Sequence, residues 1–284
     1  LQAVFAAAGI TKYSIADEVA EICLSGYLGI QTCRKALQRV CFACGAVADD
    51  SRSDTIKVYK PDRYVSSTVG LNRKFNGNSK VALDKYVSGV SIECKNYTLE
   101  DQTSDIYKGF LQAGDTRITF SGPYLQDSVT ATAGIIKVVK TNYMVIHMDS
   151  ARECVITGKK YANTAFIYQK NVTLLEAGET ESLKSFSDCT IFNAELLPEV
   201  ADNLMSYYAL RQKVDMKYLE NQEQVGNWIN IESIGGKVST TLIESQSVDL
   251  SGGYIATAKC RGYSTVVTDP AYTGEIYMGE RGLI

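Results

Sequence analysis

The sequence predicts an α+β fold that is rich in antiparallel β-barrel-like sheet, with a small αβ unit and two main helices. Short runs of alternating apolar and polar residues recur about every 8 to 12 positions over residues 81–172, and a similar series covers residues 214–261. Residues 32–43 and 195–211 instead repeat their apolar side chains every three or four positions, which predicts helices. The chain has 284 residues, 45% hydrophobic and 21% charged, so it can bury a sizeable core.

Four segments are expected along the chain. Residues 1–62 form a small αβ unit, residues 63–172 an antiparallel β-barrel-like domain, residues 173–263 a helix with strands that close a second barrel-like region, and residues 264–284 a C-terminal extension. The first segment has candidate strands at residues 13–15, 20–24 and 56–59. In the second segment, turn residues predict separate short strands at residues 86–97, 105–110, 117–120, 135–139, 143–148, 154–157 and 161–169.

Both predicted helices carry an apolar stripe that indicates core packing. The first begins after Thr32, a candidate N-cap, and ends at Gly45, which can adopt a left-handed conformation. Its stripe consists of Cys33, Leu37, Val40, Cys41 and Cys44. The stripe of the second helix consists of Leu197, Val200, Ala201, Leu204 and Tyr208.

Charge and hydropathy narrow the range of partners. The chain has 29 Lys and Arg against 32 Asp and Glu, a net charge of -3, so we do not expect it to bind nucleic acid. No apolar run approaches the ~18 residues of a membrane span. The apolar start, residues 1–10, has no initiator Met and no basic region of a signal peptide, so we expect further residues upstream.

Eight cysteines are spread over the chain at apolar positions of predicted helices and strands, and we interpret them as reduced core thiols. The alternative is a zinc site, because Cys41 and Cys44 have CxxC spacing. That spacing falls inside a helical pattern, where positions i and i+3 share a face, so we expect no metal. The full set is Cys23, Cys33, Cys41, Cys44, Cys94, Cys154, Cys189 and Cys260.

The residue types and motifs of common catalytic sites are sparse. His147 is the one histidine and lies in a predicted strand, which excludes HExxH and three-histidine zinc sites. GxGxxG, GxxxxGK[ST] and GxSxG motifs are absent. The acidic pairs Asp49/Asp50 and Glu100/Asp101 fall in polar segments typical of solvated turns. We therefore expect no catalytic, cofactor-binding or metal-binding residues, and no enzyme activity.

Two parts of the sequence carry a resemblance to a known family. Residues 36–47 and 50–59 resemble a segment of prophage tail proteins of Firmicutes, and so do residues 201–208, 225–229 and 248–258. The family is that of phage tail or baseplate hub proteins, related to late-control-type hubs of contractile tails. Its members often have Gly-Asp where this chain has Gly226 and Asn227, and the resemblance transfers no catalytic residue.

The resemblance implies a β-barrel-rich hub that forms a homotrimeric ring and joins the tail tube to the spike. Tube, spike and baseplate proteins would be its partners. It would be located in the virion tail, after assembly in the cytoplasm of the bacterial host.

Two other classes remain open, a carbohydrate or cell-wall binding module and a peptidoglycan hydrolase. The chain contains 18 tyrosines, whose rings combine apolar area with a polar hydroxyl. A binding module would gather exposed aromatic side chains in a groove, whereas a hub would bury them between subunits. The sequence does not decide where they lie.

Overall fold

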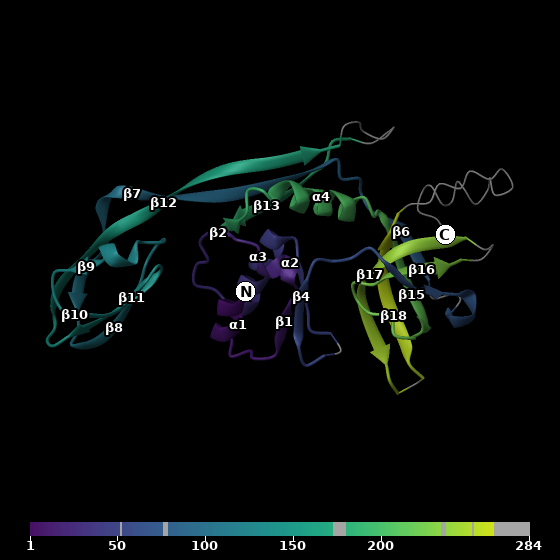
Figure 1. Cartoon of the computed structure of the whole chain (residues 1–284), viewed down its shortest axis with the longest axis horizontal. Helices are drawn as coiled ribbons and strands as arrows, with labels where there is room; N and C mark the ends of the chain where they lie inside the picture. The colour runs from purple at the N-terminus through teal and green to yellow at the C-terminus, as the bar shows by residue number, and fades with distance from the viewer. Residues whose placement is uncertain (52, 76–78, 173–179, 234–236, 252, 264–284) are drawn as a thin grey trace.

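A computed structural model describes residues 1–51, 53–75, 79–172, 180–233, 237–251 and 253–263. The chain forms an elongated row of three packed parts (Figure 1). A distal β lobe lies at one end, an N-terminal αβ unit in the middle and a six-stranded sheet at the other end. A long two-stranded ribbon runs along one side of this row. The predicted C-terminal extension, residues 264–284, lies outside the described residues.

The N-terminal unit packs three helices against a small sheet. Its helices are α1 (Gln2–Ala7), α2 (Asp17–Ala20) and α3 (Cys33–Cys44). Its strands are β1 (Tyr13–Ile15), β3 (Val47–Asp49) and β4 (Ile56–Tyr59), in the order β1-β4-β3. The buried core of the unit consists of Phe5, Val19, Val40, Cys41, Cys44 and Val58.

The sequence signals at the ends of α3 are confirmed. The Thr32 hydroxyl accepts a hydrogen bond from the backbone N–H of Lys35 at 3.3 Å, and Gly45 ends the helix with φ of 63°. The strand expected at residues 20–24 is wrong. Asp17 and Glu18 instead occupy the first turn of α2, where the helix dipole favours negative charge, and β2 (Ser25–Gly26) follows later.

The ribbon consists of β7 (Gly89–Leu111) and β12 (Arg152–Asn171), which pair antiparallel along nearly their whole length. At about 3.3 Å per residue, the 23 residues of β7 span ~75 Å. The short strands expected between residues 86–110 and 154–169 are therefore fused. Turn-type residues such as Asn96 and Gly158 remain in strand because the opposite strand continues the pairing, and two register shifts accommodate the extra residues.

The ends of the ribbon belong to different cores, while its middle is exposed. At one end, Val90, Ile92 and Cys94 are buried beneath α4 (Leu197–Tyr208). This helix confirms the one predicted at residues 195–211, with a shorter extent. The parallel strand β13 (Leu183–Cys189) pairs with the same end of β7, and the short β14 (Ile191–Phe192) pairs with β2.

The other end of the ribbon is part of the distal lobe. The lobe contains β8 (Gly114–Thr119), β10 (Ile135–Lys140) and β11 (Tyr143–Met148), in the order β10-β11-β8, and β9 (Thr130–Ala131) pairs with β12. Alternate residues of β11 point into its core, so Met144, Ile146 and Met148 are buried. The short 3-10 helix η2 (Gln126–Ser128) lies beside β12.

The six-stranded sheet combines distant parts of the sequence in the order β5-β16-β17-β18-β15-β6. Its strands are β5 (Val65–Val69), β6 (Lys80–Leu83), β15 (Gln212–Leu219), β16 (Trp228–Glu232), β17 (Val238–Asp249) and β18 (Ile255–Gly262). The sheet therefore combines strands from both sides of the expected segment boundary between residues 172 and 173.

This sheet curls around one apolar core but has no closed ring of strand pairs among the described residues. The edge strands β5 and β6 do not pair with each other, although η1 (Leu71–Arg73) follows β5 directly. The distal lobe likewise consists of a three-stranded sheet packed on the ribbon end. Where the sequence predicted two barrel-like regions, the described structure has open sheets. The α+β, sheet-rich character of the fold is confirmed.

A buried ion pair joins the two sides of the curled sheet. The Glu223 carboxylate is 0% exposed and accepts hydrogen bonds from Nη2 of Arg73 at 2.8 and 2.9 Å. It also accepts from the Ser67 hydroxyl at 3.0 Å and the backbone N–H of Asn221 at 2.7 Å. Ser67 lies in β5, Arg73 in η1, and Asn221 and Glu223 in the segment after β15. The ion pair therefore links the β5 side of the sheet to the β15 side, and we call it the latch.

Candidate functional site

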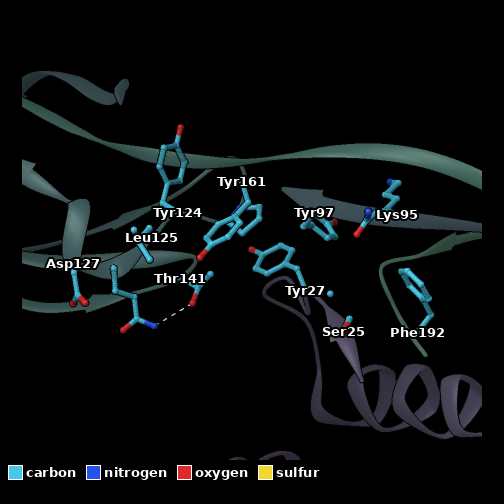
Figure 2. A pocket seen from close by; sticks show the side chains of 14 residues that line it. Ser25, Tyr27, Lys95, Tyr97, Tyr124, Leu125, Asp127, Thr141, Tyr161 and Phe192 are labelled. Carbon is cyan, nitrogen blue, oxygen red and sulfur yellow. Dashed lines mark hydrogen bonds between the residues drawn. The ribbon is translucent and has the colours of Figure 1, made fainter. Parts of the chain in front are cut away.

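A cleft of about 560 Å³ opens where the N-terminal unit, the ribbon and the distal lobe meet (Figure 2). Four tyrosines from separate parts of the sequence line it, together with polar side chains. We call it the tyrosine cleft and define it by Tyr27, Tyr97, Tyr124, Tyr161, Lys95, Asn96, Gln126, Asp127 and Thr141, with Ser25, Gly26, Pro123, Leu125 and Phe192 completing the wall.

Tyr27 enters the cleft from the N-terminal unit because of the residue before it. Gly26 has φ of 123°, and a Cβ at this position would lie 2.2 Å from the Thr190 carbonyl oxygen. Only glycine allows this approach, which lets the Tyr27 N–H donate to that carbonyl at 2.8 Å. Burial raises the pKa of the Tyr27 hydroxyl, against the opposing effect of its hydrogen bond with Asn142. The Tyr27 hydroxyl therefore stays protonated and uncharged at neutral pH.

Tyr97 and Tyr161 project from the two strands of the ribbon. The rings of Tyr27 and Tyr97 meet edge to face, with centroids 5.9 Å apart. Tyr161 lies beside one of the register shifts, where Lys160 is opposed by the three residues 100–102 of β7. The Tyr161 N–H donates to the Pro123 carbonyl at 2.9 Å, which attaches the distal segment to the ribbon at this point.

The distal side of the cleft is polar. The Gln126 amide donates to the Thr141 hydroxyl at 3.2 Å, as the dashed line in Figure 2 shows. Tyr124 is 3% exposed and packs edge to face against Phe120, with centroids 5.4 Å apart. Among the lining residues, Lys95 and Asp127 carry opposite charges. The cleft therefore combines aromatic rings with neutral hydrogen-bonding groups and has no excess of either charge.

Another cavity, of about 430 Å³, lies between α3 and β13. Phe42 and Phe186 pack across it with centroids 5.5 Å apart, and Arg39 donates to the Thr190 hydroxyl at 3.3 Å. Neither acidic pair from the sequence lines this cavity or the tyrosine cleft. Asp49 instead accepts from the Ser51 N–H in a turn, and Glu100 and Asp101 are exposed on the ribbon.

The cysteines are thiols in the structure, and five of the eight are buried. Cys41 and Cys44 lie in the core of the N-terminal unit, and burial raises the pKa of Cys41 to about 11. Cys94 of β7 lies opposite Cys189 of β13. Over the described part of the chain, no three His, Cys, Asp or Glu side chains gather in a cluster that could hold a metal ion.

His147 lies on the exposed face of β11, away from the tyrosine cleft lining. Its Nδ1 is 2.5 Å from a carboxylate oxygen of Asp115, which also accepts a hydrogen bond from Lys137. The Lys137 hydrogen bond, followed by that of His147, holds the pKa of Asp115 below its ordinary value. All three side chains are partly exposed, so the group has the character of a surface cluster of polar and charged residues.

The sequence did not identify the tyrosine cleft, because its residues are scattered between positions 25 and 192. The one available signal was the excess of tyrosine. Among the described helices, none has the length and apolar character needed to cross a membrane.

No protein-family model matches the chain, and no curated protein matches it in sequence. Among solved structures, it is similar to the 43 kDa tail protein of prophage MuSo2 from Shewanella oneidensis, with 10% identity and a TM-score of 0.46, over 88% of this chain and 60% of that one. It is similar to the tail protein from Neisseria meningitidis MC58, with 10% identity and a TM-score of 0.47, over 92% and 65% of the two chains.

A third similar structure is the prophage tail protein gp18 from Listeria monocytogenes EGD-e, with 8% identity and a TM-score of 0.42, over 94% and 65% of the two chains. All three are tail proteins. The present chain spans less than two thirds of the length of each. At these TM-scores, the likenesses assign neither a fold nor a function to this chain.

Proposed function

We propose that the chain is a structural component of a phage tail, and that it acts as a baseplate hub that joins the tail tube to the spike as a trimeric ring. The sequence resemblance supports the first statement. Its segments lie in α3, β3 and β4, in α4, and in β16 to β18, which are packed parts of the fold. The resemblance therefore concerns the scaffold and not a catalytic site.

The observation that carries the proposal is a set of exposed apolar side chains at both ends and in the middle of the ribbon. Ile167 is 65% exposed and Phe110 57%, and Leu99 and Phe166 are also exposed. The neighbouring β13 is an edge strand that exposes Leu183. Exposed apolar side chains, together with a strand edge that has no partner among the described residues, favour association with another protein surface.

A closed ring of identical subunits would cover such edges on every copy. The elongated row of three packed parts also suits an assembly component, since each part can contact a different neighbour (Figure 1). Tube, spike and baseplate proteins are the partners we propose, with a location in the virion tail after assembly in the host cytoplasm. The chain has no proposed catalytic role.

The experiment is a measurement of oligomeric state by light scattering and native mass spectrometry on the longest protein that contains this chain. We expect a trimer, and we expect Ile167→Asp and Phe110→Asp to shift it to monomer. The matched control is Asn163→Asp, because Asn163 is an exposed polar residue of β12, the strand that contains Ile167. A monomer at high protein concentration, or equal behaviour of all three variants, would contradict the proposal.

A further inference from the structure

We propose that the tyrosine cleft binds a neutral oligosaccharide built of pyranose sugars. This activity goes beyond a role in tail assembly and does not depend on it. The observation behind it is the combination of half-buried tyrosine rings and neutral polar side chains around one cavity. This is the arrangement by which a binding module would differ from a purely structural component.

The size of the cleft suits a short oligosaccharide. Its volume of about 560 Å³ falls within the range of roughly 300–1,000 Å³ that is common for small-molecule sites. Its walls come from three parts of the fold that are held together by backbone hydrogen bonds, those of Tyr27 with Thr190 and of Tyr161 with Pro123. The site is therefore largely formed before a ligand arrives, which lowers the entropic cost of binding.

The tyrosines supply the apolar contacts that a sugar ring needs. A pyranose has faces of C–H groups, and these pack on the electron-rich face of an aromatic ring. Tyr27, Tyr97 and Tyr161 are each only partly buried, so ring surface remains available in the cleft. In Figure 2 these three rings lie close together at the centre of the cleft. A ligand with alternating apolar faces and polar edges fits such a surface better than a wholly apolar one does.

The polar lining matches sugar hydroxyls and acetamido groups. The Gln126 amide carries two donors and an acceptor, and it uses one donor on Thr141. Lys95 and Asp127 offset each other in charge, so the cleft does not select for an anion such as a phosphate. The amide and hydroxyl groups among the lining residues can both donate and accept hydrogen bonds, which favours an uncharged, hydroxyl-rich ligand.

The proposal is tested by isothermal titration calorimetry with N-acetylglucosamine trimer and with maltotriose, each titrated to about 10 mM. We expect saturable binding of at least one probe, with one site per chain. Tyr161→Ala and Gln126→Ala should each weaken this binding by about tenfold or more. Tyr161→Phe, which keeps the ring, should weaken it less.

The matched control is Tyr254→Ala, because Tyr254 is 60% exposed and lies outside the cleft. Circular dichroism and the melting temperature check that each variant is folded. Absence of binding by both sugars would overturn the proposal, as would binding that the cleft variants leave unchanged. If cleft variants failed only in self-association, the cleft would instead belong to a subunit interface. The oligomeric state of the wild type tests the hub separately.

Discussion

Removal of the Arg73 side chain should destabilise the six-stranded sheet, because it breaks the buried ion pair with Glu223. Arg73→Ala would leave the Glu223 carboxylate, which is 0% exposed, with the Ser67 hydroxyl and the Asn221 N–H as its hydrogen-bond donors. It would also remove hydrogen bonds from Arg73 to the carbonyl of Leu219 at 2.7 and 3.0 Å and to that of Thr68 at 3.2 Å.

The loss in stability can be worked from these contacts. Removal of one partner from a buried ion pair costs about 3–5 kcal/mol, because the remaining charge stays buried without its counter-charge. The Arg73 side chain is 19% exposed, so water can partly replace it and the lower end of this range is expected. With a dependence on urea of about 2 kcal/mol per M, a loss of ~3 kcal/mol shifts the unfolding midpoint by ~1.5 M.

The chain provides its own probe for this measurement. Trp228 is the one tryptophan, is 8% exposed and lies in β16 of the same sheet, so its fluorescence reports unfolding of this part of the molecule. Arg63→Ala is the matched control, because Arg63 is exposed shortly before β5. If the two variants unfolded at the same urea concentration as the wild type, the latch would contribute nothing and the reasoning would be refuted.

Four further predictions use other parts of the fold. Leu204 packs on the core beneath α4, so Leu204→Asp should lower the free energy of unfolding by about 2–3 kcal/mol in chemical denaturation. The control variant Gln212→Ala should change this free energy little. Thiol titration in denaturant should recover all eight cysteines, and markedly fewer would indicate disulfides. Burial and a hydrogen bond to Glu244 raise the pKa of Tyr207 from 10 to about 12. The contribution of Tyr207 to stability is therefore present below pH 10 and is lost as pH rises to about 12. This loss of stability at high pH should be smaller in Tyr207→Phe. Purified peptidoglycan should release no soluble fragments on incubation, and release abolished by a carboxylate substitution would identify a hydrolase.

Local sequence signals predicted the elements whose structure depends mainly on their own residues. The apolar stripe of α3, with Thr32 before it and Gly45 after it, specified a helix and both of its ends. The stripe of α4 did the same less accurately, because Leu196, its N-cap residue, makes no side-chain capping hydrogen bond. Alternation likewise predicted β11, whose buried and exposed residues follow one another strictly.

The ribbon could not be predicted in this way because partner strands override local preference. Asn96 is typical of turns, yet it lies in β7 and pairs with Thr164 of β12, and this long pairing keeps the strand extended. The six-stranded sheet could not be predicted from the sequence for a related reason. Its two edge strands come from residues 65–83, and the four strands between them come from residues 212–262, so no local window contains the pairing.

The tyrosine cleft depends on a still smaller number of long-range contacts. Its walls belong to parts of the fold with separate cores, so the burial of apolar residues within each core does not determine where the walls meet. The meeting points are instead the close approach of Gly26 to Thr190 and the pairing of Tyr161 with Pro123. A side chain at position 26 would collide with a backbone oxygen, which cannot move without displacing β14. A single glycine thus determines the position of Tyr27 in the cleft, although the residue is exposed and contributes nothing to any core.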